Sequence, residues 1–244
     1  MFRSAVFFLG MAISAVLFCP IAIASWPIPP VPRMRVIGLW ARFICWWLKI
    51  TCNLHHEVEG LHHLTANPPG IILSKHQSAW ETIMFQVIFP PQIWALKREA
   101  LWLPFFGWGL AATSPISIDR STPIKALERL LKQGCEKIRE GRWVIIFPEG
   151  TRMAPGESGA FHPGGAMLAV KAKVPITPVA HDAGLYWGKR SFLKKPGVVQ
   201  VKIGPPISTE NKKARAVNEE ARAWIENSMT LLLKAPEKRT DLQK

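Results

Sequence analysis

Short apolar runs alternate with helix-like segments over most of the chain, and this alternation constrains the fold more than any other feature. The runs that read as strands are residues 71–74, 93–97, 116–118, 144–147, 176–180 and 198–203. Segments with helical periodicity, at 78–88, 122–140 and 165–172, separate several of them. An amphipathic segment at 209–235 follows the last strand, and we expect it to pack on the domain. The alternation predicts an α/β fold with a mostly parallel sheet flanked by helices.

The N-terminal segment has the composition of a membrane anchor. Residues 5–26 carry no charge, and their length suits one bilayer span of about 20 residues. Only Arg3 precedes this segment, whereas several cations follow it: Arg33, Arg35, Arg42 and Lys49. The excess of cations after the span predicts that the rest of the chain is cytoplasmic. A cleaved signal peptide is the alternative, because Ala22-Ile23-Ala24 resembles a cleavage site after an apolar core.

A second apolar segment, residues 34–50, has helical spacing and cations that can reach lipid headgroups. We interpret it as an amphipathic helix at the membrane surface, and a helix packed in the protein core is the alternative. The predicted organisation is a membrane anchor at 1–52, one catalytic domain at 53–236 and a polar tail at 237–244. A chain of 244 residues is large enough for one such domain with a sizeable core.

The charge balance points to an anionic partner. Lys and Arg number 31 against 17 acidic residues, which gives a formal net charge of +14. No nucleic-acid-binding motif is visible, so an anionic membrane surface or an anionic substrate is the expected partner. The four cysteines form no Cys-x-x-Cys pair or metal-ligand cluster, and we expect neither a metal nor a cofactor.

His76 and Glu81 are the first candidates for chemistry. They follow the predicted strand 71–74 directly, at its junction with a helix. Five residues separate them, so the carboxylate can accept the imidazole N–H and fix the ring's tautomer. An imidazole held in this way is a good general base. Ser78 lies two residues further along the helix and is expected to point elsewhere, which favours direct transfer over an acyl-enzyme intermediate.

Four stretches resemble, in order and spacing, the motif blocks of the glycerolipid acyltransferases. They are Ser74-Lys75-His76-Gln77-Ser78-Ala79-Trp80-Glu81, Ile116-Ser117-Ile118-Asp119-Arg120, Phe147-Pro148-Glu149-Gly150-Thr151-Arg152 and Val174-Pro175-Ile176-Thr177-Pro178-Val179. Lys97-Arg98-Glu99 precedes the second block. The resemblance covers roughly residues 58–206 and is strongest to the bacterial 1-acyl-sn-glycerol-3-phosphate acyltransferases. In one respect the chain differs from the family pattern, because the first block usually ends in Asp and here ends in Glu81.

The resemblance implies a glycerolphosphate-acyltransferase-like fold and a set of substrate contacts. It assigns binding of the glycerol phosphate to Lys97, Arg120, Glu149, Gly150, Thr151 and Arg152. Arginine suits this role because its planar guanidinium binds phosphate in a fixed geometry. A structural salt bridge to Asp119 or Glu149 is the alternative for Arg120. Glu149 either accepts a hydrogen bond from the acceptor's hydroxyl or orients Arg152.

A nearly continuous apolar stretch, residues 101–110, provides a candidate site for an acyl chain or for membrane contact. Its members singled out here are Leu101, Trp102, Phe105, Phe106 and Trp108. A plain buried helix is the alternative.

These features predict an enzyme that transfers a fatty acyl group from a thioester to the free hydroxyl of lysophosphatidate, with His76 as base and Glu81 orienting it. The co-substrate is expected to be acyl-CoA or an acyl carrier protein thioester, at the cytoplasmic side of a bacterial inner membrane. A different lyso-lipid acceptor, such as a lyso-ornithine lipid, is one alternative. A non-catalytic lipid-binding relative is the other.

Overall fold

The computed structural model describes residues 1–65, 68–118 and 122–234, and for Thr65 and Lys97 it describes the backbone alone. The strands are β1 (Leu54–Glu59), β2 (Ile71–Ser74), β3 (Gln92–Lys97), β4 (Ile116–Ile118), β5 (Trp143–Ile146), β6 (Ile176–His181) and β7 (Gly197–Ile203). The helices are α1 (Phe2–Ala24), α2 (Pro30–Cys52), α3 (His62–Thr65), α4 (Trp80–Ile88), α5 (Phe106–Ala111), α6 (Pro123–Arg139), α7 (Gly164–Ala172) and α8 (Ala214–Lys234). Two short 3-10 helices, η1 (Arg98–Trp102) and η2 (Ala183–Leu185), complete the described elements.

The strands form one sheet in the order β1-β7-β6-β2-β5-β3-β4. All neighbouring strands in it run parallel except β6 and β7, which are antiparallel. The predicted fold class, a mostly parallel sheet flanked by helices, is confirmed. The polar sequence of β1 is not among the apolar runs that predicted strands, and the structure shows a full edge strand there, paired with β7.

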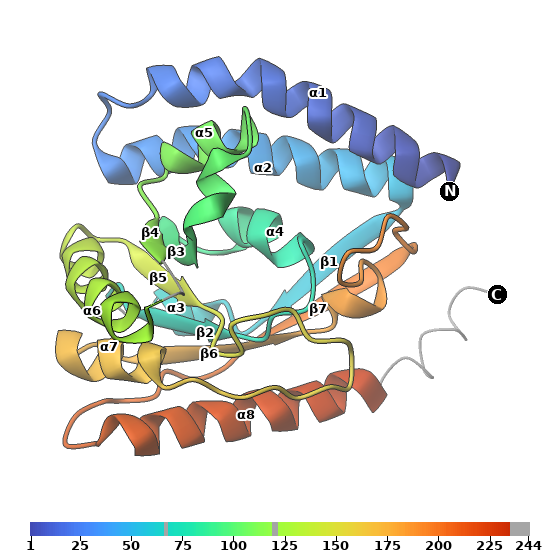
Figure 1. The fold of residues 1–244 in the computed structure, drawn as a ribbon. Helices are drawn as coiled ribbons and strands as arrows, with labels where there is room; N and C mark the ends of the chain where they lie inside the picture. The colour runs from blue at the N-terminus through green and yellow to red at the C-terminus, as the bar shows by residue number, and fades with distance from the viewer. Residues whose placement is uncertain (66–67, 119–121, 235–244) are drawn as a thin grey trace.

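Helices cover both faces of the sheet (Figure 1). Side chains that alternate along β2 enter the two core layers in turn, because successive strand residues point to opposite faces. Ile72 packs in the layer that contains residues of α2 and α4. Ile71 and Leu73 pack in the layer that contains residues of α7 and α8. The sheet is therefore buried on both sides, which explains why its central strands β2 and β5 are buried at every position and mainly apolar.

Helices α1 and α2 form an antiparallel hairpin that lies over α4 and α5 (Figure 1). The two helices approach closely at Gly10, where an added Cβ would lie 2.2 Å from Nε1 of Trp47. Trp47 donates a hydrogen bond to the carbonyl of Phe7 (3.2 Å), and the backbone N–H of Lys194 donates to Oγ of Ser4 (3.0 Å). These contacts fasten α1 both to its neighbour helix and to the loop before β7.

The outward faces of the hairpin are apolar. Among the described residues, α1 is the one helix whose length and composition would allow it to cross a bilayer. Its exposed side chains include Leu9, Ile13 and Leu17. One face of α2 packs in the core, as the core-helix alternative states, while Phe43 and Trp46 on its other side are exposed. The hairpin thus combines a buried face with an apolar face that no described residue covers.

Candidate active site

The candidate site lies at the carboxyl ends of three adjacent strands, β6, β2 and β5. The parallel register pairs Leu73 of β2 with Ile146 of β5, and Ser74 of β2 with Val179 of β6. The loops that follow these strands therefore lie side by side. This edge is where parallel sheets usually bind ligands, since loops from neighbouring strands converge there.

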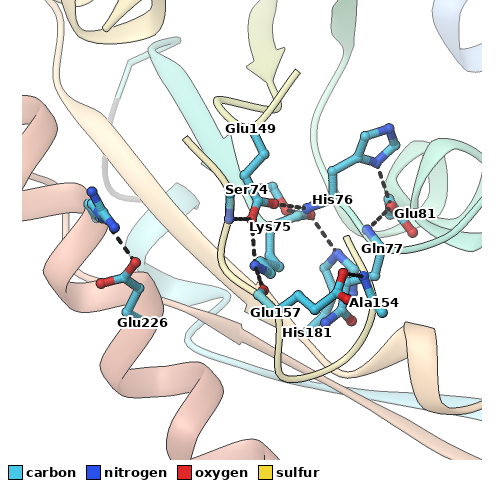
Figure 2. Close-up of polar contacts among 12 residues, drawn as sticks. Ser74, Lys75, His76, Gln77, Glu81, Glu149, Ala154, Glu157, His181 and Glu226 are labelled. Carbon is cyan, nitrogen blue, oxygen red and sulfur yellow. Dashed lines mark hydrogen bonds and ion pairs between the residues drawn. The ribbon is translucent and has the colours of Figure 1, made fainter. Parts of the chain in front are cut away.

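His76 and Glu81 are in direct contact (Figure 2). Nδ1 of His76 lies 2.7 Å from Oε1 of Glu81, which also accepts hydrogen bonds from the backbone N–H groups of Gln77 (2.9 Å) and Ser78 (2.8 Å). This geometry places a proton on Nδ1 and leaves Nε2 as the acceptor of the ring. Phe147 stacks on the imidazole with ring centroids 4.1 Å apart, so the ring is fixed in orientation as well as in tautomer.

Glu81 is a buried carboxylate that stays ionised. Burial alone raises its pKa, but the hydrogen bond from His76, the electrostatic influence of the His181 and His76 imidazoles, and the N–H of Ser78 together lower the pKa below its usual value. The glutamate side chain is long enough to contact both the imidazole of His76 and the backbone N–H of Ser78. The longer side chain in place of the family's usual Asp is therefore compatible with a hydrogen-bonded pair.

Lys75 and Glu149 form a second buried pair directly behind His76 (Figure 2). Nζ of Lys75 lies 2.5 Å from Oε1 of Glu149, and the two side chains are 7% and 3% exposed. Oε2 of Glu149 accepts a hydrogen bond from the backbone N–H of His76 (3.2 Å). Lys75 also donates to the carbonyl of Glu157 (2.7 Å). The pair thus connects the loop after β2 to the loop after β5.

His181, at the end of β6, adds a third contact to the same loop. Its Nε2–H donates to the carbonyl of Lys75 (2.9 Å), and its Nδ1 accepts from the N–H of Ala183 (3.4 Å). Both ring nitrogens are used by the neutral form. Burial lowers the pKa of His181, although the carboxylate of Glu81 and the bond to Lys75 act in the opposite direction. His181 therefore holds the His76 loop as a neutral side chain.

A single large cavity of about 1370 Å³ opens in front of His76. Gly150 and Arg152 line it with His76, and Nε of Arg152 is buried with no hydrogen-bond partner among the described residues. Its remaining walls are mainly apolar, and they come from several elements, among them α1, α4, α5 and α6, and from the loop before β7. The volume exceeds that of a typical small-molecule site, so the cavity has room for two substrates with long apolar parts.

The cavity gathers some of the residues predicted from the sequence and leaves others out. Phe105 and Phe106 line it, whereas Trp102 and Trp108 are exposed on the outside and Leu101 is half-buried away from it. The exposure of these aromatic side chains excludes the plain buried helix considered for residues 101–110. Arg120 lies outside the described residues, and the side chain of Lys97 does too.

The structure places two further predicted residues differently from the family assignment. Thr151 is exposed and lies outside the cavity lining. Glu149 is buried and paired with Lys75, behind the cavity wall. No described contact joins Glu149 to Arg152, and its contact with the acceptor stays a prediction. Its partner is the lysine that precedes His76, because β2 and β5 are neighbours in the sheet.

Sequence reasoning missed Lys75 and His181. A lysine directly between a mainly apolar strand and a candidate catalytic histidine was a signal for a buried ion pair, since lysine is seldom buried without a partner. His181 gave no such signal. Ser78 is buried, and its Oγ accepts a hydrogen bond from the N–H of Trp80 (3.0 Å), so it is not presented to the cavity as a nucleophile. Within the described residues, no group of three or more His, Cys, Asp or Glu side chains forms a metal site.

Comparison with known proteins gives consistent matches. A family model described as Acyltransferase matches residues 55–182. A 1-acyl-sn-glycerol-3-phosphate acyltransferase of Pseudomonas aeruginosa is 44% identical over 93% of this chain and 90% of its own length. A protein of the same name from Saccharomyces cerevisiae is 33% identical over 75% of this chain and 62% of its own length. The crystal structure of the 1-acyl-sn-glycerophosphate (LPA) acyltransferase PlsC from Thermotoga maritima has the same fold, with a TM-score of 0.79 over 95% of both chains at 19% identity.

Proposed function

Since this chain belongs to the acyltransferase family, we propose that it transfers a fatty acyl group from a thioester to the free hydroxyl of lysophosphatidate, giving phosphatidate. The names of its relatives support this acceptor. The observation that carries the chemistry is the imidazole of His76, which is held by the buried Glu81 and faces a cavity that Arg152 also lines.

His76 acts as the general base in this proposal. A hydroxyl is a weak nucleophile, so Nε2 of His76 takes its proton while the oxygen attacks the thioester carbonyl. The new C–O bond forms, the C–S bond breaks, and the proton passes from the imidazolium to the departing thiolate. Glu81 stabilises the imidazolium through its bond to Nδ1 and prevents the ring from turning. The products are the ester and a free thiol.

Lys75 and Glu149 position the base. Oε2 of Glu149 holds the N–H of His76, and the charge of Lys75 keeps that carboxylate in place. His181 holds the carbonyl of Lys75 from the other side. The loop that carries His76 is thus bound from two neighbouring strands, so the ring needs little rearrangement to reach a productive geometry.

Arg152 is the described residue best suited to hold the acceptor's phosphate. Its guanidinium lines the cavity with His76, and its Nε is buried without a partner among the described residues, which favours an anionic ligand. We also assign phosphate contacts to Lys97 and Arg120 on the family resemblance alone. Gly150 has a positive φ of 65°, and the turn it permits brings the chain from Glu149, behind the cavity, to Arg152 on its wall.

The apolar part of the cavity accommodates acyl chains, and the protein works at a membrane. Phe105 and Phe106 line the cavity, and Trp102 and Trp108 lie exposed beside them. Together with the apolar outer faces of α1 and α2, they form a surface suited to lipid. Packing of α1 against the domain supports its retention as an anchor, and the cations that follow it support a cytoplasmic location at a bacterial inner membrane.

Thiol release from acyl-CoA by the purified full chain, with and without lysophosphatidate, tests the function. We expect release only when the acceptor is present, and its loss in His76→Ala. Release with a lyso-ornithine lipid but not with lysophosphatidate would correct the acceptor. No release with any lyso-lipid, from either acyl-CoA or acyl carrier protein thioester, would identify a lipid-binding relative without turnover.

A further inference from the structure

The cavity extends along helix α1 from one end of the domain to the other. Phe8 of α1 lines it and stacks on Phe192, in the loop before β7. Ala22 of α1 also lines it, and its Cβ lies 3.9 Å from the Cβ position of Gly109 in α5. Fourteen helical residues separate Phe8 from Ala22, which corresponds to a length of about 21 Å.

The two ends of this cavity differ in chemistry. Near α5 the lining is apolar and includes Leu103, Leu110 and Leu127. Near the loop before β7 the lining includes Arg190 and Ser191. Helix α4, which follows His76, lies between α5 and this loop along the length of α1 (Figure 1). His76 and residues of α4 line the same cavity as these two ends.

The cationic end belongs to a basic loop, residues 187–195. This loop contains Lys189, Arg190, Lys194 and Lys195, and it contains no acidic residue. Lys189, Arg190 and Lys195 are exposed. Of these four cations, only Arg190 lines the cavity. Arg190 has no hydrogen-bond or ion-pair partner among the residues that the structure describes, so its guanidinium is free to bind an anion.

The basic loop is held firmly against α1. The side chain of Lys194 is buried, and its Nζ lies 3.3 Å from the ring centroid of Phe8 and 4.3 Å from that of Trp187. The same Nζ donates to the carbonyl of Phe192 (2.9 Å). The ammonium thus joins the loop to the helix by cation–π contacts. Arg190, with a positive φ of 57°, is presented from a turn that is fixed at its base.

We infer that Arg190 binds a phosphate group of the phosphopantetheine arm of the acyl donor. This inference rests on the proposed function, because it takes the donor to be an acyl thioester. An acyl thioester is linear, with an apolar chain, then the reacting carbonyl, then the pantetheine arm and its phosphate. The cavity presents an apolar wall, the base and a cation within one continuous space. The phosphate of the acceptor, at Arg152, and that of the donor, at Arg190, then occupy different places.

The test compares Arg190→Gln with a matched control, Lys195→Gln, which removes a charge from the same loop outside the cavity. Binding of a thioether analogue of acyl-CoA to the full chain in detergent micelles is measured by calorimetry, and initial rates give the two KM values. We expect Arg190→Gln to weaken analogue binding and raise the donor KM about tenfold, the loss of one charge-assisted hydrogen bond. The acceptor KM of this variant and both constants of Lys195→Gln should stay within about twofold of wild type.

Truncated donors identify the group that Arg190 contacts. The effect of Arg190→Gln should persist with acyl-phosphopantetheine, which carries the phosphate common to coenzyme A and acyl carrier protein. It should disappear with acyl-pantetheine, which has no phosphate. An effect confined to acyl-CoA would instead assign Arg190 to the nucleotide phosphates and overturn the assignment to the arm.

Other outcomes contradict the inference outright. An equal effect with all three donors would show that Arg190 does not contact a phosphate of the donor. A loss of binding to anionic vesicles with an unchanged donor KM would show that Arg190 serves the membrane. Failure of the wild-type chain to bind the analogue would also overturn it. If the wild-type chain binds the analogue but transfers nothing to lysophosphatidate, only the proposed acceptor fails, and the comparison of analogue binding still decides the role of Arg190.

Discussion

Replacing Glu149 with Gln tests whether this residue positions the base or contacts the acceptor. The carboxylate lies 2.5 Å from Nζ of Lys75, and both side chains are almost fully buried. Its other oxygen accepts the N–H of His76. Glutamine has nearly the same shape and can still accept that hydrogen bond, so the substitution removes the negative charge and little else.

The size of the effect follows from the burial of Lys75. At 2.5 Å and an effective dielectric constant of 20, the attraction between the two charges is about 7 kcal/mol, and desolvation of both groups offsets much of it. Removing one partner leaves the other charge buried and unpaired, which costs about 3–5 kcal/mol. For a chain of this size we expect the unfolding midpoint to fall by about 6–20 °C.

Thermal unfolding and steady-state kinetics of the same preparations measure both consequences. We expect Glu149→Gln to lower the midpoint and kcat, because the His76 loop loses its anchor. Lys75→Met should behave similarly, and the double variant Lys75→Met with Glu149→Gln should recover most of the midpoint, since no buried charge remains unpaired. Glu226→Gln is the matched control, because that carboxylate forms an exposed pair with Arg222 and its loss should cost less than about 1 kcal/mol.

One result would refute this reasoning. If Glu149→Gln unfolds at the wild-type midpoint and only the KM for the acceptor rises, Glu149 contacts the substrate, as the family resemblance implies. The ion pair with Lys75 would then have no positioning role.

Three further substitutions probe the base, the apolar surface and the buried histidine. His76→Ala should lower kcat by about 10²- to 10⁴-fold with the fold retained, and Glu81→Gln should lower kcat to a comparable extent; a fully active His76→Ala would exclude the base assignment. Replacing Phe105 and Phe106 with Asp should weaken vesicle flotation or shift the preferred acyl length, and no change in either would remove both roles. Because the pKa of His181 is lowered in the folded chain, the unfolded chain binds more protons below pH 6.5, and the free energy of unfolding should fall as the pH drops from about 7.5 to about 5.5. His181→Gln should show a weaker fall. An identical pH profile would contradict the assignment of His181 as a buried neutral side chain.

Local pattern was sufficient to locate most of the sheet. The apolar runs predicted β2 to β7 to within one residue at each end, because a strand buried on both faces needs an uninterrupted apolar segment. The edge strand β1 was largely missed, because its sequence, Leu-His-His-Glu-Val-Glu, is polar and it pairs with β7 alone. The contact between His76 and Glu81 was also within reach of the sequence, since only five residues and one turn separate them.

The partners of Glu149 and His181, and the position of Arg190 in the cavity lining, were decided by the tertiary structure alone. Lys75 meets Glu149 across 74 residues and His181 across 106 residues. These residues come into contact because β5 and β6 both pair with β2 in the folded sheet. Arg190 reaches the cavity only because α1 packs along the domain and holds the basic loop at its end. Sequence determined which segments become strands and helices, because those choices depend on near neighbours. The tertiary structure decided which buried charges form ion pairs and which cations line the cavity. Both depend on which strands are neighbours in the sheet and on how the helices pack against it.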